Sequence, residues 1–138
     1  SAQDYAANAG NQARFDYVLL LDVTEHIEDQ DLLEILVAAK RLLKPPGRLI
    51  VHTPNLDYWL ERLKDRGVLP QLHGHIAVRN ESGNVGLLEQ AGFTAEAVTG
   101  LPHYRQPMRL IDSFLMRLPL LGRLFRSRLF IVARGGAA

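Results

Sequence analysis

The stretch Asp16-Tyr-Val-Leu-Leu-Leu-Asp22-Val-Thr-Glu25-His26 decides the fold of this chain. Five apolar residues, Tyr17 to Leu21, follow one another without alternation, which is typical of a strand buried on both faces. Acidic and imidazole side chains come directly after them. Because ligands of α/β proteins bind beyond the carboxyl ends of the strands, we expect a functional site at this turn.

A helix and a second strand follow the turn. Asp29 is a candidate N-cap, and apolar residues then recur at helical spacing as far as Leu43. Lys44-Pro-Pro-Gly47 breaks the helix, and Arg48-Leu-Ile-Val-His-Thr53 has the apolar run of a second buried strand. A strand, a helix and a strand in this order predict a right-handed crossover between parallel strands.

The rest of the chain predicts further helices and two closing strands. Gly92 is expected to end one helix in the pattern Ala91-Gly-Phe93. The expected elements are a loop over 1–14, helices over about 56–66 and 82–91, a strand over 94–99, an amphipathic stretch over 108–125 interrupted by Pro119 and Gly122, and a closing strand over 129–133.

Composition excludes several classes of function. The chain has 138 residues, of which 47% are hydrophobic and 22% charged, as in an ordinary globular domain. Sixteen basic and 15 acidic residues give a net charge of +1, so there is no clear nucleic-acid signal. The absence of cysteine excludes disulfides and cysteine metal sites and agrees with a cytoplasmic location, which we expect.

Charge is nevertheless unevenly distributed. From His103 to the end the sequence has seven arginines and a single acid, Asp112. Two interpretations stay open. The stretch 108–128 can pack over a substrate cleft with its arginine stems directed outward, or it can make peripheral contact with an anionic membrane or a lipid-linked substrate.

The order of these motifs resembles the C-terminal half of a class I S-adenosylmethionine-dependent methyltransferase, over most of residues 15–134. Leu21-Asp-Val-Thr-Glu-His26 resembles the family's D-V-L-E-H turn after its fourth strand, and Leu42-Leu-Lys-Pro-Pro-Gly-Arg48 is similar to its L-K-P-G-G sequence. Thr24 and Pro46 depart from these patterns. The resemblance implies a partial Rossmann-like α/β fold, strands four to seven, mostly parallel with an antiparallel last strand.

The family's glycine-rich cofactor loop has no counterpart in this sequence, which begins at Ser1. We therefore expect a partial domain of a larger enzyme. Its parts would be 1–14, a linker or remnant of the third-strand region; 15–55, the strand–helix–strand core; and 56–138, the substrate-side part. One alternative is a truncated or degenerate module with a binding or assembly role, without activity alone, which dimerises through the exposed sheet edge. Another alternative is a flavodoxin-like receiver, but the two closing strands, which lack a regular crossover between them, argue against that fold.

The resemblance implies methyl transfer from S-adenosylmethionine to an oxygen of a small or lipid-linked metabolite. The protein must then position the acceptor and take up its proton, for which Glu25 and His26 are the nearest candidates. An alternative is that Glu25 steadies the turn and His26 packs. The implied cofactor-binding residues are Leu21, Asp22 and Val23 under the methionine part and Asp4 at the adenine amino group.

A metal site is a further hypothesis. Asp22-x-x-Glu25-His26 with a distant His75 resembles the E-x-x-E-H plus histidine that holds a divalent ion in small-RNA 2′-O-methyltransferases and in some ubiquinone-pathway O-methyltransferases. Glu-His also occurs in members without metal, so the metal ligands stay undetermined. His52, in the middle of the second strand, is expected in the core or in a cleft wall.

Overall fold

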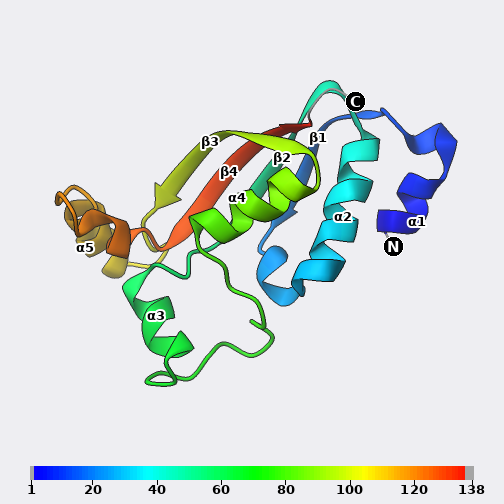
Figure 1. Cartoon of the computed structure of the whole chain (residues 1–138). Helices are drawn as coiled ribbons and strands as arrows, with labels where there is room; N and C mark the ends of the chain where they lie inside the picture. The colour runs from blue at the N-terminus through cyan, green and yellow to red at the C-terminus, as the bar shows by residue number, and fades with distance from the viewer. Residues whose placement is uncertain (1, 136–138) are drawn as a thin grey trace.

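The fold is described by a computed structural model, which covers residues 2–135. Four strands form one sheet in the order β1-β2-β4-β3 (Figure 1). They are β1 (Phe15–Leu21), β2 (Leu43–Pro54), β3 (Phe93–Leu101) and β4 (Arg128–Gly135). β1 and β2 are parallel, and β4 is antiparallel to both of its neighbours. The predicted sheet with an antiparallel last strand is confirmed.

Two helices, α2 (Asp29–Leu42) and α4 (Glu81–Gln90), cover one face of the sheet (Figure 1). Apolar residues recur along α2 at helical spacing, and they bury its inner side against β2 and β4. Leu49 of β2 and Ile131 of β4 are both 0% exposed at the centre of this core. The covered face therefore contains the main hydrophobic core of the chain.

The other face of the sheet is open along β1. Tyr17, Leu19 and Leu21 alternate along this strand, and 57%, 55% and 49% of their surfaces are exposed. The intervening Val18 and Leu20 pack on the core. The prediction of a strand buried on both faces is therefore wrong for this chain, because β1 is an edge strand and α2 and α4 both lie on its other side.

The N-terminal segment is helical, so the predicted loop over 1–14 is wrong for most of its length. It forms α1 (Ala2–Ala7) and the 3-10 turn η1 (Ala9–Asn11). Ala6 is 1% exposed and packs against Ala38 and Leu42 of α2. Small side chains on both helices allow this close approach, and α1 thereby extends the helical layer beyond the sheet (Figure 1).

Two turns differ in detail from the prediction. Glu28, and not Asp29, is the N-cap of α2, and it makes no side-chain cap bond. Lys44–Gly47 form a bulge inside β2, because the pairing with β1 jumps from Phe15–Leu43 to Tyr17–Arg48. A Cβ at Gly47 would lie 2.7 Å from the carbonyl oxygen of Lys44, so the bulge requires glycine.

The C-terminal helices are shorter than predicted. α3 (Trp59–Asp65) begins late, because the side chain of Asn55 accepts a bond from the backbone N–H of Asp57 and holds a turn there. The stretch 108–125 forms α5 (Met108–Leu115) and the 3-10 turn η3 (Gly122–Phe125), with Leu120 at a φ of 68° between them. Within the described part of the chain, every helix is too short or too polar to span a bilayer.

Candidate functional site

The chain leaves the sheet directly after β1, at Asp22. Its backbone N–H donates to the carbonyl of His52, which extends the parallel ladder by one residue. Asp22 then has a φ of 53°, an uncommon conformation for a residue with a side chain, and the 3-10 turn η2 (Thr24–His26) follows. η2 turns Glu25 inward, where it is 1% exposed, and leaves His26 exposed.

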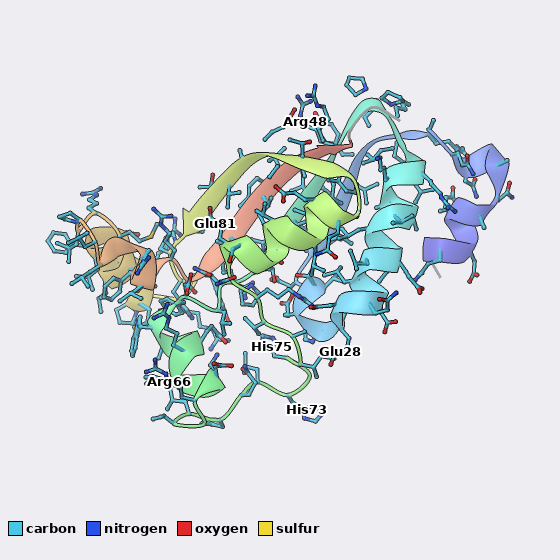
Figure 2. The ribbon with its side chains drawn as sticks, viewed as in Figure 1. Glu28, Arg48, Arg66, His73, His75 and Glu81 are labelled. Atoms are coloured by element: carbon cyan, nitrogen blue, oxygen red, sulfur yellow. The ribbon has the colours of Figure 1, made fainter. Side chains whose placement is uncertain are left out.

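The loop between α3 and α4 returns to this turn (Figure 2). The backbone N–H groups of Ile76 and Ala77 donate to the carbonyl of Glu25 at 3.0 and 3.1 Å. These bonds bring His75 beside His26, with ring centroids 4.9 Å apart and the rings edge to face. Residues separated by about fifty positions in the sequence thus meet at the carboxyl end of β1.

A single side chain, Arg79, fixes the loop in this position. Its guanidinium donates to the carbonyls of Thr24 and Ile27, both at 2.7 Å, and to the carboxylate of Asp29 at 2.8 Å. Arg79 is 9% exposed, so these bonds are largely shielded from water. The planar guanidinium connects η2, the start of α2 and the loop.

The immediate surroundings of Glu25 are polar but contain little positive charge. The hydroxyl of Thr53 donates to Oε2 of Glu25 at 3.3 Å, and the hydroxyl of Thr24 donates to that of Thr53 at 2.9 Å. No lysine or arginine within residues 2–135 forms an ion pair with Glu25. Burial lowers the pKa of His75, so this imidazole is neutral at pH 7.

A pocket of about 420 Å³ lies at Asp22, where the chain leaves β1. The carboxylate of Asp22 pairs with Arg128, and its Oδ1 lies 3.3 Å from Nδ1 of His52. The guanidinium of Arg128 stands 5.5 Å from the centre of the Tyr104 ring. The lining residues are Asp22, His52, Leu101, Pro102, Tyr104 and Arg128.

A protein-family model described as a methyltransferase domain matches residues 2–98. The chain belongs to this family. Its match covers the sheet edge with Asp22 and Glu25, the bulge at Gly47 and the loop with His75. The resemblance to class I S-adenosylmethionine-dependent methyltransferases is thereby confirmed. No protein in the curated collection matches the chain.

Solved structures of methyltransferases share the fold of this domain. A SAM-dependent methyltransferase from Archaeoglobus fulgidus has a TM-score of 0.68 and 17% identity, over 97% of this chain and 65% of its own. A SAM-dependent methyltransferase from Methanosarcina mazei has a TM-score of 0.66 and 13% identity, over 95% of this chain and 66% of its own. The third is the Burkholderia thailandensis 1,6-didemethyltoxoflavin-N1-methyltransferase, solved with bound 1,6-didemethyltoxoflavin and S-adenosylhomocysteine. It has a TM-score of 0.58 and 18% identity, over 96% of this chain and 48% of its own. The chain spans less than two thirds of each.

The predicted site residues of this methyltransferase domain fall into three places. Glu25 and His26 lie with His75 in η2 and the returning loop. Leu21, Asp22 and Val23 lie at the end of β1, where Leu21 and Val23 are 49% and 36% exposed. Asp4 belongs to α1, which packs on α2. The roles given to these residues stay predictions.

Sequence reasoning missed three residues of this methyltransferase domain that shape the site. Arg79 and Arg128 carry no local signal, because their partners in the site lie far along the chain; Arg128 and Asp22 are 106 positions apart. Tyr104 joins the site through its contact with the guanidinium of Arg128. His52 lines the pocket, as a cleft-wall residue would. A hint was present in the position of Arg128, the first residue of β4, because this antiparallel strand begins beside the carboxyl end of β2, where His52 lies.

Proposed function

We propose that this methyltransferase domain takes part in S-adenosylmethionine-dependent methyl transfer to an oxygen of a small or lipid-linked metabolite, as part of a larger enzyme. The observation that carries the proposal is the open pocket lined by Asp22, the residue directly after β1, in a chain of this family. Residues 15–55 supply the cofactor side of this pocket, and 56–138 supply the substrate side.

The cofactor's methionine part would lie along Leu21, Asp22 and Val23. Their exposed side chains support this assignment, because a ligand can reach them without rearrangement of the core. Asp22 is held by Arg128 and faces His52, so its carboxylate is oriented before any ligand binds. An acid fixed in this way can receive a cationic amino group. Asp4 remains the proposed contact of the adenine amino group.

The acceptor would occupy the part of the pocket next to Tyr104. In the reaction the acceptor oxygen attacks the methyl carbon, the carbon–sulfur bond breaks, S-adenosylhomocysteine leaves, and the acceptor's proton passes to a base. We assign that base to His26 with Glu25 behind it. Support comes from their exposure: His26 is open to solvent, whereas Glu25 is 1% exposed and can only act through a neighbour.

NMR titration of the isotopically labelled chain with S-adenosylhomocysteine tests the cofactor assignment. We expect amide shifts at Leu21, Asp22 and Val23 and their loss in Asp22→Ala. Asp16→Asn is the matched control, because Asp16 lies near the other end of β1 and forms an ion pair with Lys44. Shifts confined to residues away from the end of β1 would contradict the assignment.

The surface of α5 supports the lipid-linked form of the acceptor. Leu110 and Phe114 of α5 are 66% and 68% exposed, and Leu120, between α5 and η3, is 92% exposed. Asp112, the one acid after His103, is 0% exposed and accepts bonds from the Tyr58 hydroxyl and the His103 N–H, both at 3.0 Å. The charge that this segment presents to solvent is therefore carried by arginine, which complements an anionic bilayer.

Vesicle flotation tests this membrane contact. We expect the chain to float with phosphatidylglycerol vesicles and to stay at the bottom with phosphatidylcholine vesicles. The variant Phe114→Ser/Leu120→Ser should lose flotation, whereas Val68→Ser, which removes an apolar residue of similar exposure elsewhere, should retain it. An absence of flotation with both vesicles would exclude the membrane contact and leave a soluble small-molecule acceptor.

The edge strand β1 favours a second candidate function, an assembly module without activity of its own. One backbone edge of β1 has no strand beside it within the described chain, and Tyr17, Leu19 and Leu21 line the adjoining face. A homodimer could pair two such edges. Light scattering after size exclusion would detect a dimer, and Leu19→Lys should convert it to a monomer. A monomer at all concentrations would exclude this candidate.

A further inference from the structure

We propose that a small cavity beside α3 is a subsite for a hydroxyl group of the methyl acceptor, and that Glu61 selects acceptors that carry this group. The cavity has a volume of about 80 Å³, and its lining includes Tyr58, Glu61, His75, Tyr104 and Arg128. A water molecule occupies about 30 Å³ in the liquid, so the cavity admits a hydroxyl group with its carbon but excludes a ring. The proposal rests on the proposed function, because its ligand is the acceptor of that reaction.

The carboxylate of Glu61 provides the strongest evidence for a ligand. Glu61 lies in α3 and is 7% exposed. Its Oε1 accepts a hydrogen bond from Nζ of Lys64 at 2.6 Å, whereas its Oε2 is buried and has no hydrogen-bond partner within residues 2–135. Because a buried carboxylate oxygen without a donor is costly, a ligand group that donates to Oε2 would be stabilised in the cavity.

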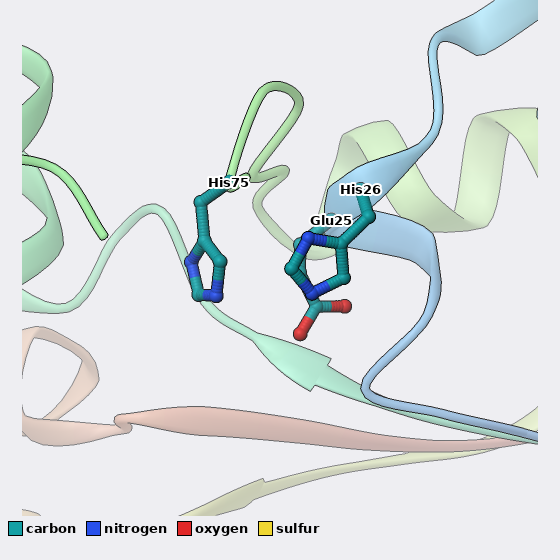
Figure 3. Close-up of side chains that lie close together, drawn as sticks. All are labelled: Glu25, His26 and His75. Carbon is teal, nitrogen blue, oxygen red and sulfur yellow. The ribbon is translucent and has the colours of Figure 1, made fainter. Parts of the chain in front are cut away.

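A second buried atom at this cavity also lacks a partner. Nδ1 of His75 makes no hydrogen bond to any described residue, and Figure 3 shows it on the side of the ring away from Glu25 and His26. A hydroxyl group donates one hydrogen and accepts through two lone pairs. It can therefore satisfy both kinds of atom, because it donates to Oε2 of Glu61 and accepts from Nδ1 of His75 in the tautomer that carries its proton there.

The charges around the cavity favour a neutral ligand group. The ammonium group of Lys64 already compensates the carboxylate of Glu61, and Arg128 lines the same cavity. A cationic ligand group would meet these two positive side chains, whereas an anionic group would meet the free oxygen of Glu61. A hydroxyl group avoids both repulsions and still supplies the missing donor.

Aromatic rings form one wall of the subsite. The rings of His103 and Tyr104 stack with their centroids 4.7 Å apart, and the centroid of the Tyr58 ring lies 6.4 Å from that of His103. The carboxylate of Asp112, which is 0% exposed, accepts hydrogen bonds from the Tyr58 hydroxyl and the His103 N–H. This shared acceptor fixes the two residues relative to each other, so the wall is in place before a ligand binds.

Two residues connect the subsite with the larger pocket at Asp22. Tyr104 and Arg128 line both hollows, which therefore adjoin. An acceptor whose reacting oxygen lies in the larger pocket next to Tyr104 can place a second hydroxyl group in the subsite. The class of acceptor is thus a metabolite with at least two hydroxyl groups, of which one is methylated and the other is recognised by Glu61.

NMR titration of the isotopically labelled chain with phenol and with anisole tests the subsite. The two probes share a ring that can stack on Tyr104 in the larger pocket, but only phenol has a hydrogen to donate to Glu61. We expect phenol to shift the amides of Glu61 and His75 and to bind at least about tenfold more tightly than anisole, which cannot make the hydrogen bond to the carboxylate. Equal affinities, or phenol shifts that spare both amides, would overturn the proposal.

Glu61→Gln changes the chemistry of the cavity and keeps its size. Lys64 retains an oxygen as its acceptor, so the amide nitrogen takes the place of Oε2 and the preference for phenol over anisole should disappear. Glu61→Asp keeps the charge but withdraws the carboxylate, so it should weaken phenol binding even if the glutamine variant fails to fold. Glu89→Gln, at an exposed residue of α4, is the matched control and should bind both probes like the wild type.

The outcome of this experiment is independent of the proposed function. A preference for phenol that both variants at Glu61 retain would overturn the subsite, whereas the NMR response to S-adenosylhomocysteine would be unaffected. If phenol is preferred through Glu61 and S-adenosylhomocysteine does not bind, the hydroxyl site stands and the proposed methyl transfer fails. The two proposals therefore fail separately.

Discussion

The two faces of the sheet differ in what covers them, although the same strands form both. On the helix side, Leu49 and Ile131 are 0% exposed. On the open side, Tyr17 and Leu19 of β1 are more than half exposed, although Leu19 is as apolar as the residues of the core. The difference teaches that the covered face supplies the stability of this chain, whereas the open face is available to ligands or to another part of a protein.

The most direct test of this difference is the same leucine-to-alanine substitution on each face of the sheet. Leu49→Ala should lower the free energy of unfolding by about 2–5 kcal/mol, because it leaves a cavity in the core. Leu19→Ala should lower it by less than about 1 kcal/mol, since its side chain is 55% exposed. Urea unfolding measures both, and equal losses would show that the open face is packed in solution.

Loss of the hydrogen bonds that Arg79 makes should lower the free energy of unfolding nearly as much as loss of core packing. Arg79→Ala removes the bonds to Thr24, Ile27 and Asp29 and leaves carbonyls without donors, so we expect a loss of about 2–3 kcal/mol. Hydrogen exchange should rise in η2 and in the returning loop. Arg66→Ala, at an exposed arginine near the end of α3, is the control and should change neither quantity.

A charge on the open face sharpens the comparison further. Leu21→Lys adds an ammonium group at a residue that is 49% exposed, so we expect a change within about 0.5 kcal/mol in unfolding free energy. The same variant should abolish any dimer and weaken the NMR response to S-adenosylhomocysteine. A large destabilisation in dilute monomeric protein would contradict the assignment of this face as open.

A small effect is also expected at the bulge. Lys44 and Asp16 form an ion pair at 2.9 Å across β1 and β2, and both side chains are largely exposed. A double-mutant cycle with alanine at both positions should give a coupling below about 1 kcal/mol that fades as salt is added. A larger coupling would mean that the bulge contributes to the register of the two strands.

Much of the fold could be predicted because its signals are local. The strand before Asp22, the helix after it and the glycine turn at Gly92 each depend on residues within one element. The exposure of β1 could not be predicted in the same way. An apolar strand has the same sequence whether its second face is covered or open, so burial depends on elements outside it.

The residues of the candidate site show the same distinction between local and long-range signals. Asp22, Glu25 and His26 are close enough in the sequence to be recognised together, and His75, which the metal hypothesis grouped with them, lies beside His26. Arg79 and Arg128 were not predicted, because Arg79 binds the carbonyl of Thr24 and Arg128 the carboxylate of Asp22, which lie 55 and 106 positions away. A surface arginine and a clamping arginine are identical in sequence, and the difference appears when the chain has folded.

The sheet order also fixes a sequence of events during synthesis. β3 pairs with β4 and with no other strand of the described chain, and β4 is made some thirty residues later. Until the ribosome has released β4, the apolar edge of β2 and the whole of β3 have no sheet partner. β4 is therefore the last of the described strands to enter the sheet, between two strands that precede it, and apolar surface of both stays exposed until it does.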